Sequence, residues 1–133
     1  MAVFVLYLSW QAVTVYHGQF SSMGDDYYLR GMTDEALELY RSARRIIPWS
    51  AASNLGISQT LRALGRSREA LPVLRQALFF APRHQPLLLE LGLCHAGLGD
   101  WSEAAIAFRR AASVSSREAA LALKMAEIGR AHV

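Results

Sequence analysis

The sequence contains very little cysteine and lysine. Cys94 is the only cysteine among the 133 residues, so no intrachain disulfide can form and packing alone must hold the fold. Lys124 is the only lysine, and arginine supplies the rest of the 14 basic side chains, which face 11 acidic ones. The net charge of +3 is mildly basic and lacks the dense basic stripe of a nucleic-acid binder. We therefore expect no nucleic-acid partner.

Motifs for catalysis and for cofactors are missing as well. The pair Cys94-His95 would need a second cysteine at position 91 to form a haem-attachment motif, and Leu91 stands there. The four histidines show no metal-ligand spacing, and no glycine-rich phosphate loop or nucleophile motif occurs. We predict no catalytic residue, no metal and no cofactor, and we do not expect an enzyme.

Charged side chains are absent from residues 1–24, and an apolar run from Ala2 to Tyr16 is interrupted only by Ser9, Gln11 and Thr14. A membrane-spanning helix needs about 20 apolar residues, a length reached here only if two further polar residues are tolerated. Three interpretations stay open. We favour a single membrane-spanning helix within residues 1–22 over a helix packed in protein. A cleaved signal peptide is disfavoured because a basic start and a small-residue cleavage site are lacking.

Small and polar residues of this segment share one helix face. Tyr7, Gln11, Thr14 and Gly18 are spaced as i, i+4, i+7 and i+11, which predicts a face that packs on another membrane helix, unless the spacing is chance. Arg30 is the first basic residue, so the charge distribution hardly determines orientation. We predict a single-pass protein of a bacterial inner membrane, with a slight preference for a periplasmic carboxyl-terminal part.

The strongest pattern in the sequence is an internal repeat with a period of 34 residues. A glycine is expected to end each first helix, and a glutamate is expected in the first turn of each second helix, where the helix dipole favours negative charge. Each alanine allows close helix approach, and each large residue fills the space between hairpins. The columns are Gly31, Gly65, Gly99; Glu35, Glu69, Glu103; Ala36, Ala70, Ala104; Tyr40, Leu74, Phe108; Ala43, Ala77, Ala111; and Pro48, Pro82, Ser116.

These columns resemble those of the tetratricopeptide repeat family. The resemblance implies an all-α, right-handed solenoid of helical hairpins, here preceded by the predicted membrane helix. Repeats are expected at residues 17–50, 51–84 and 85–118, followed by a closing helix at 119–133. Capping residues are expected at Thr33, Ser67 and Ser102.

Two departures from a regular solenoid stand out. Pro72 lies inside a second helix and should delay or kink it. The closing helix is apolar on much of its surface, whereas solenoid ends are normally polar. Either another chain, a second copy or a membrane covers it, which makes a homo-oligomer possible, or one face simply packs on the third repeat. The absence of proline near residue 17 also predicts one continuous helix from about residue 3 to 30.

The resemblance implies that first helices line a concave groove that binds protein partners. The family's clamp for peptide carboxylates needs lysine and asparagine at positions that here hold Ser21 and Asp25, Leu55 and Gln59, and Leu89 and Leu93. That clamp is absent, and a partner with apolar anchors is expected instead. Leucines of the groove could equally belong to the core. The predicted partner-binding residues are Tyr28, Leu29, Leu55, Gln59, Arg62, Leu89, Leu93 and Arg130.

Together these patterns predict a membrane-anchored scaffold that assembles or stabilises a larger complex of membrane subunits. One alternative is a non-catalytic accessory subunit of a membrane enzyme, for example in envelope polysaccharide synthesis or electron transfer. Another is a soluble adaptor built from the same repeats.

Overall fold

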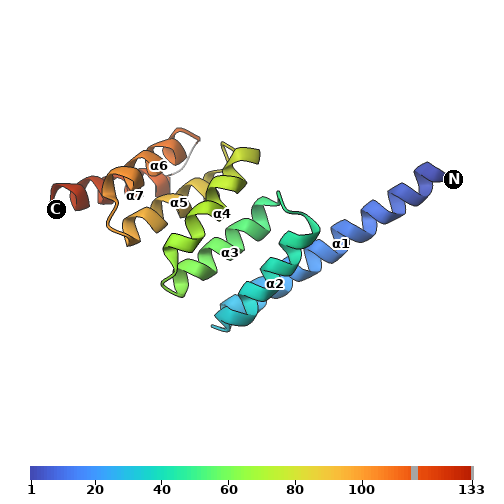
Figure 1. The fold of residues 1–133 in the computed structure, drawn as a ribbon. Coiled ribbons are helices and arrows are strands. Elements are labelled where there is room, and N and C mark those ends of the chain that lie inside the picture. Colours follow the sequence, from blue (N-terminus) through green and yellow to red (C-terminus); the bar gives the residue numbers. More distant parts are fainter. Residues whose placement is uncertain (115–116, 133) are drawn as a thin grey trace.

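A computed structural model of the chain describes residues 1–114 and 117–132. This part of the chain is entirely helical apart from its short connections (Figure 1). The elements are α1 (Ala2–Leu29), α2 (Thr33–Ile46), α3 (Ala51–Ala63), α4 (Ser67–Phe80), α5 (Gln85–Gly97), α6 (Trp101–Val114) and α7 (Arg117–Ala131).

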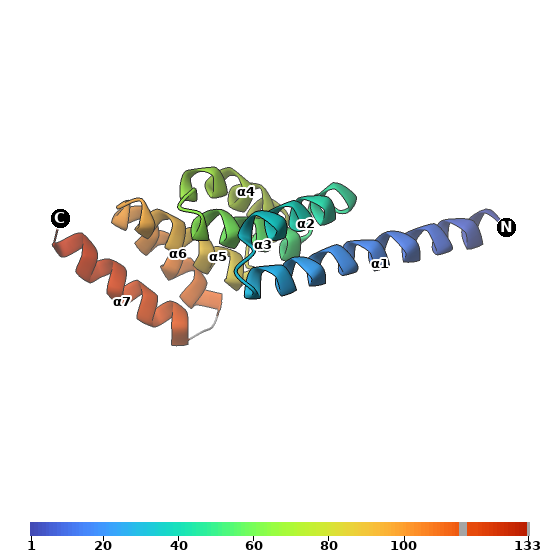
Figure 2. The same ribbon diagram turned by 90° about the horizontal axis from the view of Figure 1, so that it is seen from below.

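The helices form a row of antiparallel hairpins. α1 pairs with α2, α3 with α4 and α5 with α6, and α7 packs on α6. Neighbouring hairpins stack along the chain, so the two termini lie at opposite ends of the molecule (Figure 1). Seen from below, α1 extends far past the end of α2, while its later part lies against the stack (Figure 2). The expected all-α hairpin solenoid is confirmed, as is the single continuous helix at the amino terminus.

Each hairpin turn is built on a glycine with a left-handed backbone. Gly31, Gly65 and Gly99 have φ angles of 78°, 74° and 80°, a region that side chains with a Cβ rarely adopt. After α1, the Gly31 N–H donates to the Tyr28 carbonyl and the Met32 N–H donates to the Tyr27 carbonyl. This double closure satisfies carbonyls that the end of a helix leaves free. The other two turns repeat it, which explains why glycine recurs at this column.

The repeat columns form the core. All six alanines of the two alanine columns are buried, and so are Tyr40, Leu74 and Phe108. The Tyr40 ring lies against Gly24 and Gly56, where an added Cβ would come within 2.7 and 2.5 Å of ring carbons. The Tyr40 hydroxyl donates to Asp25 Oδ1 at 2.6 Å, so this ring joins three helices. Burial and the nearby Asp25 carboxylate raise the Tyr40 pKa above its ordinary value.

The predicted capping residues are wrong in all three turns. Thr33 and Ser67 are the first residues of α2 and α4, and the preceding Met32 and Arg66 make no side-chain cap. Ser102 lies inside α6, one residue after its start. Side-chain caps occur instead on first helices, where Ser50 and His84 accept from the N–H groups of Ser53 and Leu87. In the first two turns only one residue, Met32 or Arg66, separates the glycine from the second helix. Thr33 and Ser67 are therefore already the first helical residues.

Pro72 does not delay its helix. α4 begins at Ser67, at the same repeat position as α2, and continues to Phe80. Pro72 is the sixth residue of α4, so it lacks the N–H that would bond to the Arg68 carbonyl four residues earlier. This removes one bond near the start of the hydrogen-bond ladder, and the helix continues past it.

The prediction of a membrane-spanning helix in residues 1–22 is not supported. Among the described residues, no helix combines the length and the hydropathy that crossing a bilayer requires. α1 has 28 residues and is long enough, but Ser9, Gln11 and Thr14 and the polar residues after them dilute its apolar run. The predicted single-pass localisation is corrected with it.

The closing helix α7 has two different faces. Ala119 and Ala126 are buried against α6, whereas Leu121, Met125 and Ile128 are exposed. One face therefore packs on the third hairpin, as one of the two interpretations expected. The opposite face leaves large apolar side chains uncovered.

Candidate peptide-binding groove

A partly buried ion pair joins two neighbouring first helices. Arg62 on α3 donates from Nε to Glu90 Oε1 on α5 at 2.6 Å and from Nη2 to Oε2 at 3.4 Å. The Glu90 side chain is only 3% exposed, while that of Arg62 is 36% exposed. The hydrogen bond to the Glu90 carboxylate raises the pKa of the Arg62 guanidinium, which favours its charged form. The pair ties the second hairpin to the third and leaves part of a guanidinium at the surface.

The single thiol lies behind this ion pair. Cys94 is fully buried one turn after Glu90, and its Sγ lies 3.9 Å from Glu90 Oε1. Burial and the Glu90 carboxylate disfavour a thiolate and raise the pKa of Cys94 to about 12, although Arg62 opposes the shift. A thiol in this state is a poor nucleophile, so the geometry gives Cys94 a packing role.

We expect Cys94 to react with Ellman's reagent far more slowly in the folded chain than in urea. The folded state holds the Cys94 proton more tightly than the unfolded state, whose thiol has the ordinary pKa of 9.0. The contribution of this difference to the free energy of unfolding is fully present below pH 9.0. That effect is lost as the pH rises from 9.0 toward 12. Urea melts across this range measure the loss, and a Cys94→Ala variant should lack that part of the pH dependence. Equal reaction rates for the folded and unfolded chains would contradict a buried thiol.

An apolar cavity opens between the third hairpin and the closing helix. Its volume is about 160 Å³, close to the size of one large aliphatic or aromatic side chain. Leu93, one turn beyond Glu90 on α5, is 40% exposed, and Met125 on α7 is 71% exposed. All of its lining side chains are apolar: Leu93, Ala96, Trp101, Phe108, Ala122, Met125 and Ala126.

Two of the predicted partner-binding residues belong to the features described above. Arg62 and Leu93 lie at the ion pair and at the cavity. Leu55 and Leu89 are half-buried and pack against the core, as the alternative interpretation of the groove leucines expected, whereas Leu93 is exposed. Tyr28 is half-buried and packs against the core as well. Their role in binding stays a prediction.

The remaining predicted groove residues are more scattered. Gln59 is half-buried on α3, and Leu29 is exposed at the end of α1. Arg130 borders a different hollow, formed with the first turn of α6 by residues 99–103. These three residues do not gather at the cavity.

The residues predicted to pack in a membrane lie on the exposed half of α1. Gln11 donates from Nε2 to the Tyr7 hydroxyl at 2.6 Å, and the Thr14 hydroxyl donates to the Gln11 carbonyl at 2.9 Å. Nothing approaches within 4 Å of a Cβ placed on Gly18. Within the described part of the chain, no second helix covers this face.

Sequence reasoning missed Glu90 and most of the cavity lining. Glu90 lies outside the groove positions that the family resemblance gave, and only its lone charge within the apolar run from Leu87 to Leu93 could have marked it. Met125 and the other cavity residues apart from Leu93 were not predicted as site residues, because the cavity depends on how α7 packs on the third hairpin.

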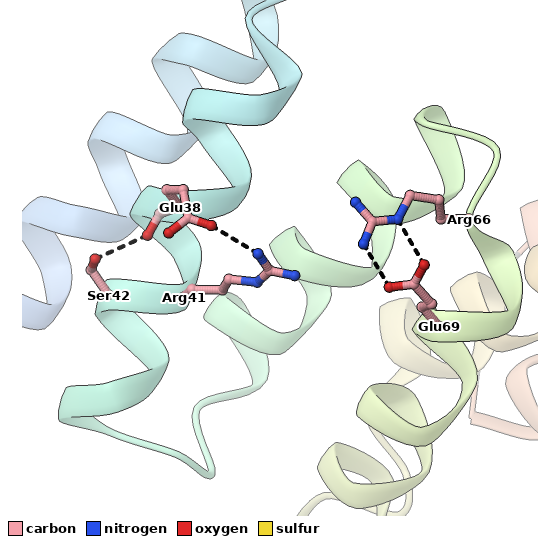
Figure 3. Close-up of polar contacts among 5 residues, drawn as sticks. All are labelled: Glu38, Arg41, Ser42, Arg66 and Glu69. Carbon is pink, nitrogen blue, oxygen red and sulfur yellow. Dashed lines mark hydrogen bonds and ion pairs between the residues drawn. The ribbon is translucent and has the colours of Figure 1, made fainter.

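Two charged pairs on or just before second helices are exposed. Figure 3 shows Arg41 bonded to Glu38 at 2.8 Å and Arg66 held by two hydrogen bonds to Glu69. Each pair lies within one turn of the chain and is open to water, where such pairs contribute little to stability. The buried Arg62–Glu90 pair is therefore the polar contact that distinguishes the groove.

The comparison with family models decides the affiliation of this fold. A model described as tetratricopeptide repeat matches residues 55–124, more than half of the chain. The chain belongs to the tetratricopeptide repeat family. Its domains are typically modules of protein–protein interaction. A search of the curated proteins found no significant match.

Solved tetratricopeptide structures superpose over most of the chain. One is the first TPR of Spaghetti (RPAP3) bound to the HSP90 peptide SRMEEVD (17% identity, TM-score 0.82, 87% of this chain and 94% of that chain). The yeast Sti1 TPR2B domain in complex with pHsp70 is also similar (15%, 0.81, 85% and 97%). So is the Yersinia enterocolitica type III secretion chaperone SycD with a peptide of the translocator YopD (13%, 0.77, 85% and 93%). At these identities the likeness concerns the fold alone.

Proposed function

We propose that this chain is an adaptor that binds a peptide segment of a partner protein along the groove of α3, α5 and α7. The observation that carries the proposal is the wholly apolar cavity between α5, α6 and α7, which shares α5 with the Arg62–Glu90 pair. A bulky apolar side chain of the peptide would fill the cavity, and a polar group elsewhere on the peptide would meet the exposed part of the Arg62 guanidinium. Peptide recognition by apolar anchors in a helical groove is a recurring mode.

The similar structures support a peptide as the partner. By their descriptions, the RPAP3 domain is bound to an HSP90 peptide, the Sti1 domain is in a pHsp70 complex, and SycD is in complex with a YopD peptide. The anchor chemistry is argued from this chain, because its groove places Leu55, Gln59, Leu89 and Leu93 where a carboxylate clamp needs lysine and asparagine. By joining its peptide to a second surface, such an adaptor would help to assemble or stabilise a larger complex.

The test is a selection of displayed random peptides on the immobilised chain. We expect the selected peptides to share one bulky apolar residue. Their affinity should fall at least about tenfold in Met125→Lys, because burying one such side chain is worth about 1.5–3 kcal/mol. The matched control is Leu121→Lys on the same helix, since Leu121 is exposed but does not line the cavity.

Selected peptides without a shared apolar residue would contradict the proposed chemistry. Equal losses of affinity in the two lysine variants would contradict the proposed location, because Met125 lines the cavity and Leu121 does not. Both variants change exposed side chains, so the fold should be kept in each, and circular dichroism checks this.

A further inference from the structure

The amino-terminal half of α1 exposes apolar side chains around its whole circumference. Six consecutive large residues, Val3–Leu8, are 50–80% exposed, and Trp10, Val15 and Tyr16 are also exposed. Successive residues of a helix are about 100° apart, so six in a row face every direction. Such a helix does not suit a groove that contacts one face, and it suits surroundings that are apolar on all sides.

Polar side chains of this half form hydrogen bonds within their own helix. The Ser9 hydroxyl donates to the Val5 carbonyl at 2.8 Å, and Gln11 and Thr14 bond to groups one turn earlier. A polar group that already has a partner costs much less to remove from water. The exposed half can therefore enter an apolar phase without leaving these donors unsatisfied.

The edge of the stack from which this half projects is basic and aromatic. Figure 1 shows that α1 leaves the stack on the side where α2 and α4 end. We define the basic edge as Arg44, Arg45, Trp49, Phe79, Phe80, Arg83 and Arg110, which lie at the ends of α2, α4 and α6 or in the loops that follow α2 and α4. Trp49, Phe79 and Phe80 are exposed, and the two phenylalanine rings meet edge to face at 5.3 Å.

Acidic groups are nearly absent from this region. Residues 39–89 contain eight arginines and one acid, Glu69, which lies at the opposite end of α4 and is paired with Arg66. In the described structure, Arg44 bonds to the neutral Gln76 and Arg110 to the Pro82 carbonyl, and no ion pair engages either one. Favourable interaction with the helix dipole explains why Arg44 and Arg45 stand in the last turn of α2. It does not explain why aromatic rings are exposed on the same edge.

We propose that the basic edge and the projecting half of α1 together dock on an anionic lipid surface. The apolar half lies in the acyl boundary, the aromatic rings lie at headgroup level, and the arginines contact lipid phosphates. A second copy of the chain is the less favoured occupant, since a symmetric dimer through this edge would bring the same arginines face to face. The proposal concerns docking on one side of a membrane, with no crossing.

The experiment is co-sedimentation of the full chain with vesicles of phosphatidylcholine, alone or mixed with phosphatidylglycerol. We expect binding to the mixed vesicles, weakened by salt, and a blue shift of tryptophan emission that is reduced in Trp10→Phe. Arg44→Gln with Arg45→Gln should weaken binding by about tenfold or more, because each arginine near an anionic surface contributes about a factor of five. Phe79→Ser with Phe80→Ser should weaken it as well.

The matched control is Arg30→Gln with Arg66→Gln. It removes the same number of charges at the opposite edge of the stack, where both residues are exposed and paired with nearby acids. Binding to vesicles should then change little. Equal losses in the two double variants, or equal binding to neutral vesicles, would overturn the proposal. So would light scattering that shows a stable dimer with no affinity for lipid.

Discussion

Replacing Phe108 by alanine is expected to lower the free energy of unfolding by about 3–5 kcal/mol. The Phe108 side chain is 3% exposed, and its ring fills the space left by Gly92, where an added Cβ would come within 2.4 Å of a ring carbon. The ring also walls the cavity between α5, α6 and α7, so its removal would enlarge an existing void. The surrounding helices cannot close such a space, which adds a cavity cost to the lost burial.

Urea unfolding followed by circular dichroism measures the change, and Phe79→Ala is the matched control. Phe79 is 81% exposed and meets only the Phe80 ring among aromatic neighbours, so its truncation should cost below about 1 kcal/mol. Similar losses in the two variants would contradict the assignment of Phe108 to the core.

Replacing Arg62 by alanine is expected to cost about 2 kcal/mol of stability. The change leaves the Glu90 carboxylate, 3% exposed, without its charged partner between two helices. Breaking a fully buried ion pair costs about 3–5 kcal/mol of stability. We expect only about 2 kcal/mol here because the Arg62 side chain is 36% exposed to water, which weakens the pair. The second and third hairpins would lose the polar contact between them.

Thermal and urea melts of Arg62→Ala and Arg66→Ala provide the comparison. Arg66 pairs with Glu69 on the surface, as Figure 3 shows, and its removal should leave stability unchanged within error. An apolar double variant, Arg62→Met with Glu90→Leu, should recover most of the loss because no charge is then buried. If Arg62→Ala were as stable as the parent chain, the Arg62–Glu90 pair would not stabilise the fold.

The repeat could be read from the sequence because its columns have strong local causes. Glycine at 31, 65 and 99 is required by a left-handed turn, and alanine at 36, 70 and 104 by close helix contact. These constraints act within one hairpin and recur unchanged. The capping prediction failed because side-chain preference alone does not say whether a serine precedes a helix or begins it.

The binding site was less predictable because it depends on contacts between hairpins. Glu90 joins Arg62 across 28 residues, and the cavity requires the position of α7 on the third hairpin. The membrane-spanning interpretation of residues 1–22 relied on the length of an apolar run, and the interruptions by Ser9, Gln11 and Thr14 weigh more than that length. A sequence repeat predicts the structure within each hairpin well, but it says little about the contacts between hairpins.

The stacking of hairpins in a row has a consequence for cooperativity. α7 packs on α6 at one end of the row in the described structure. Stability in such arrays is a sum over units and their nearest interfaces, so disorder spreads from an end inward. Detachment of α7 would open the cavity beside Leu93 while the hairpins around Tyr40 stay folded. The fold thus allows its proposed peptide site to melt and re-form on its own.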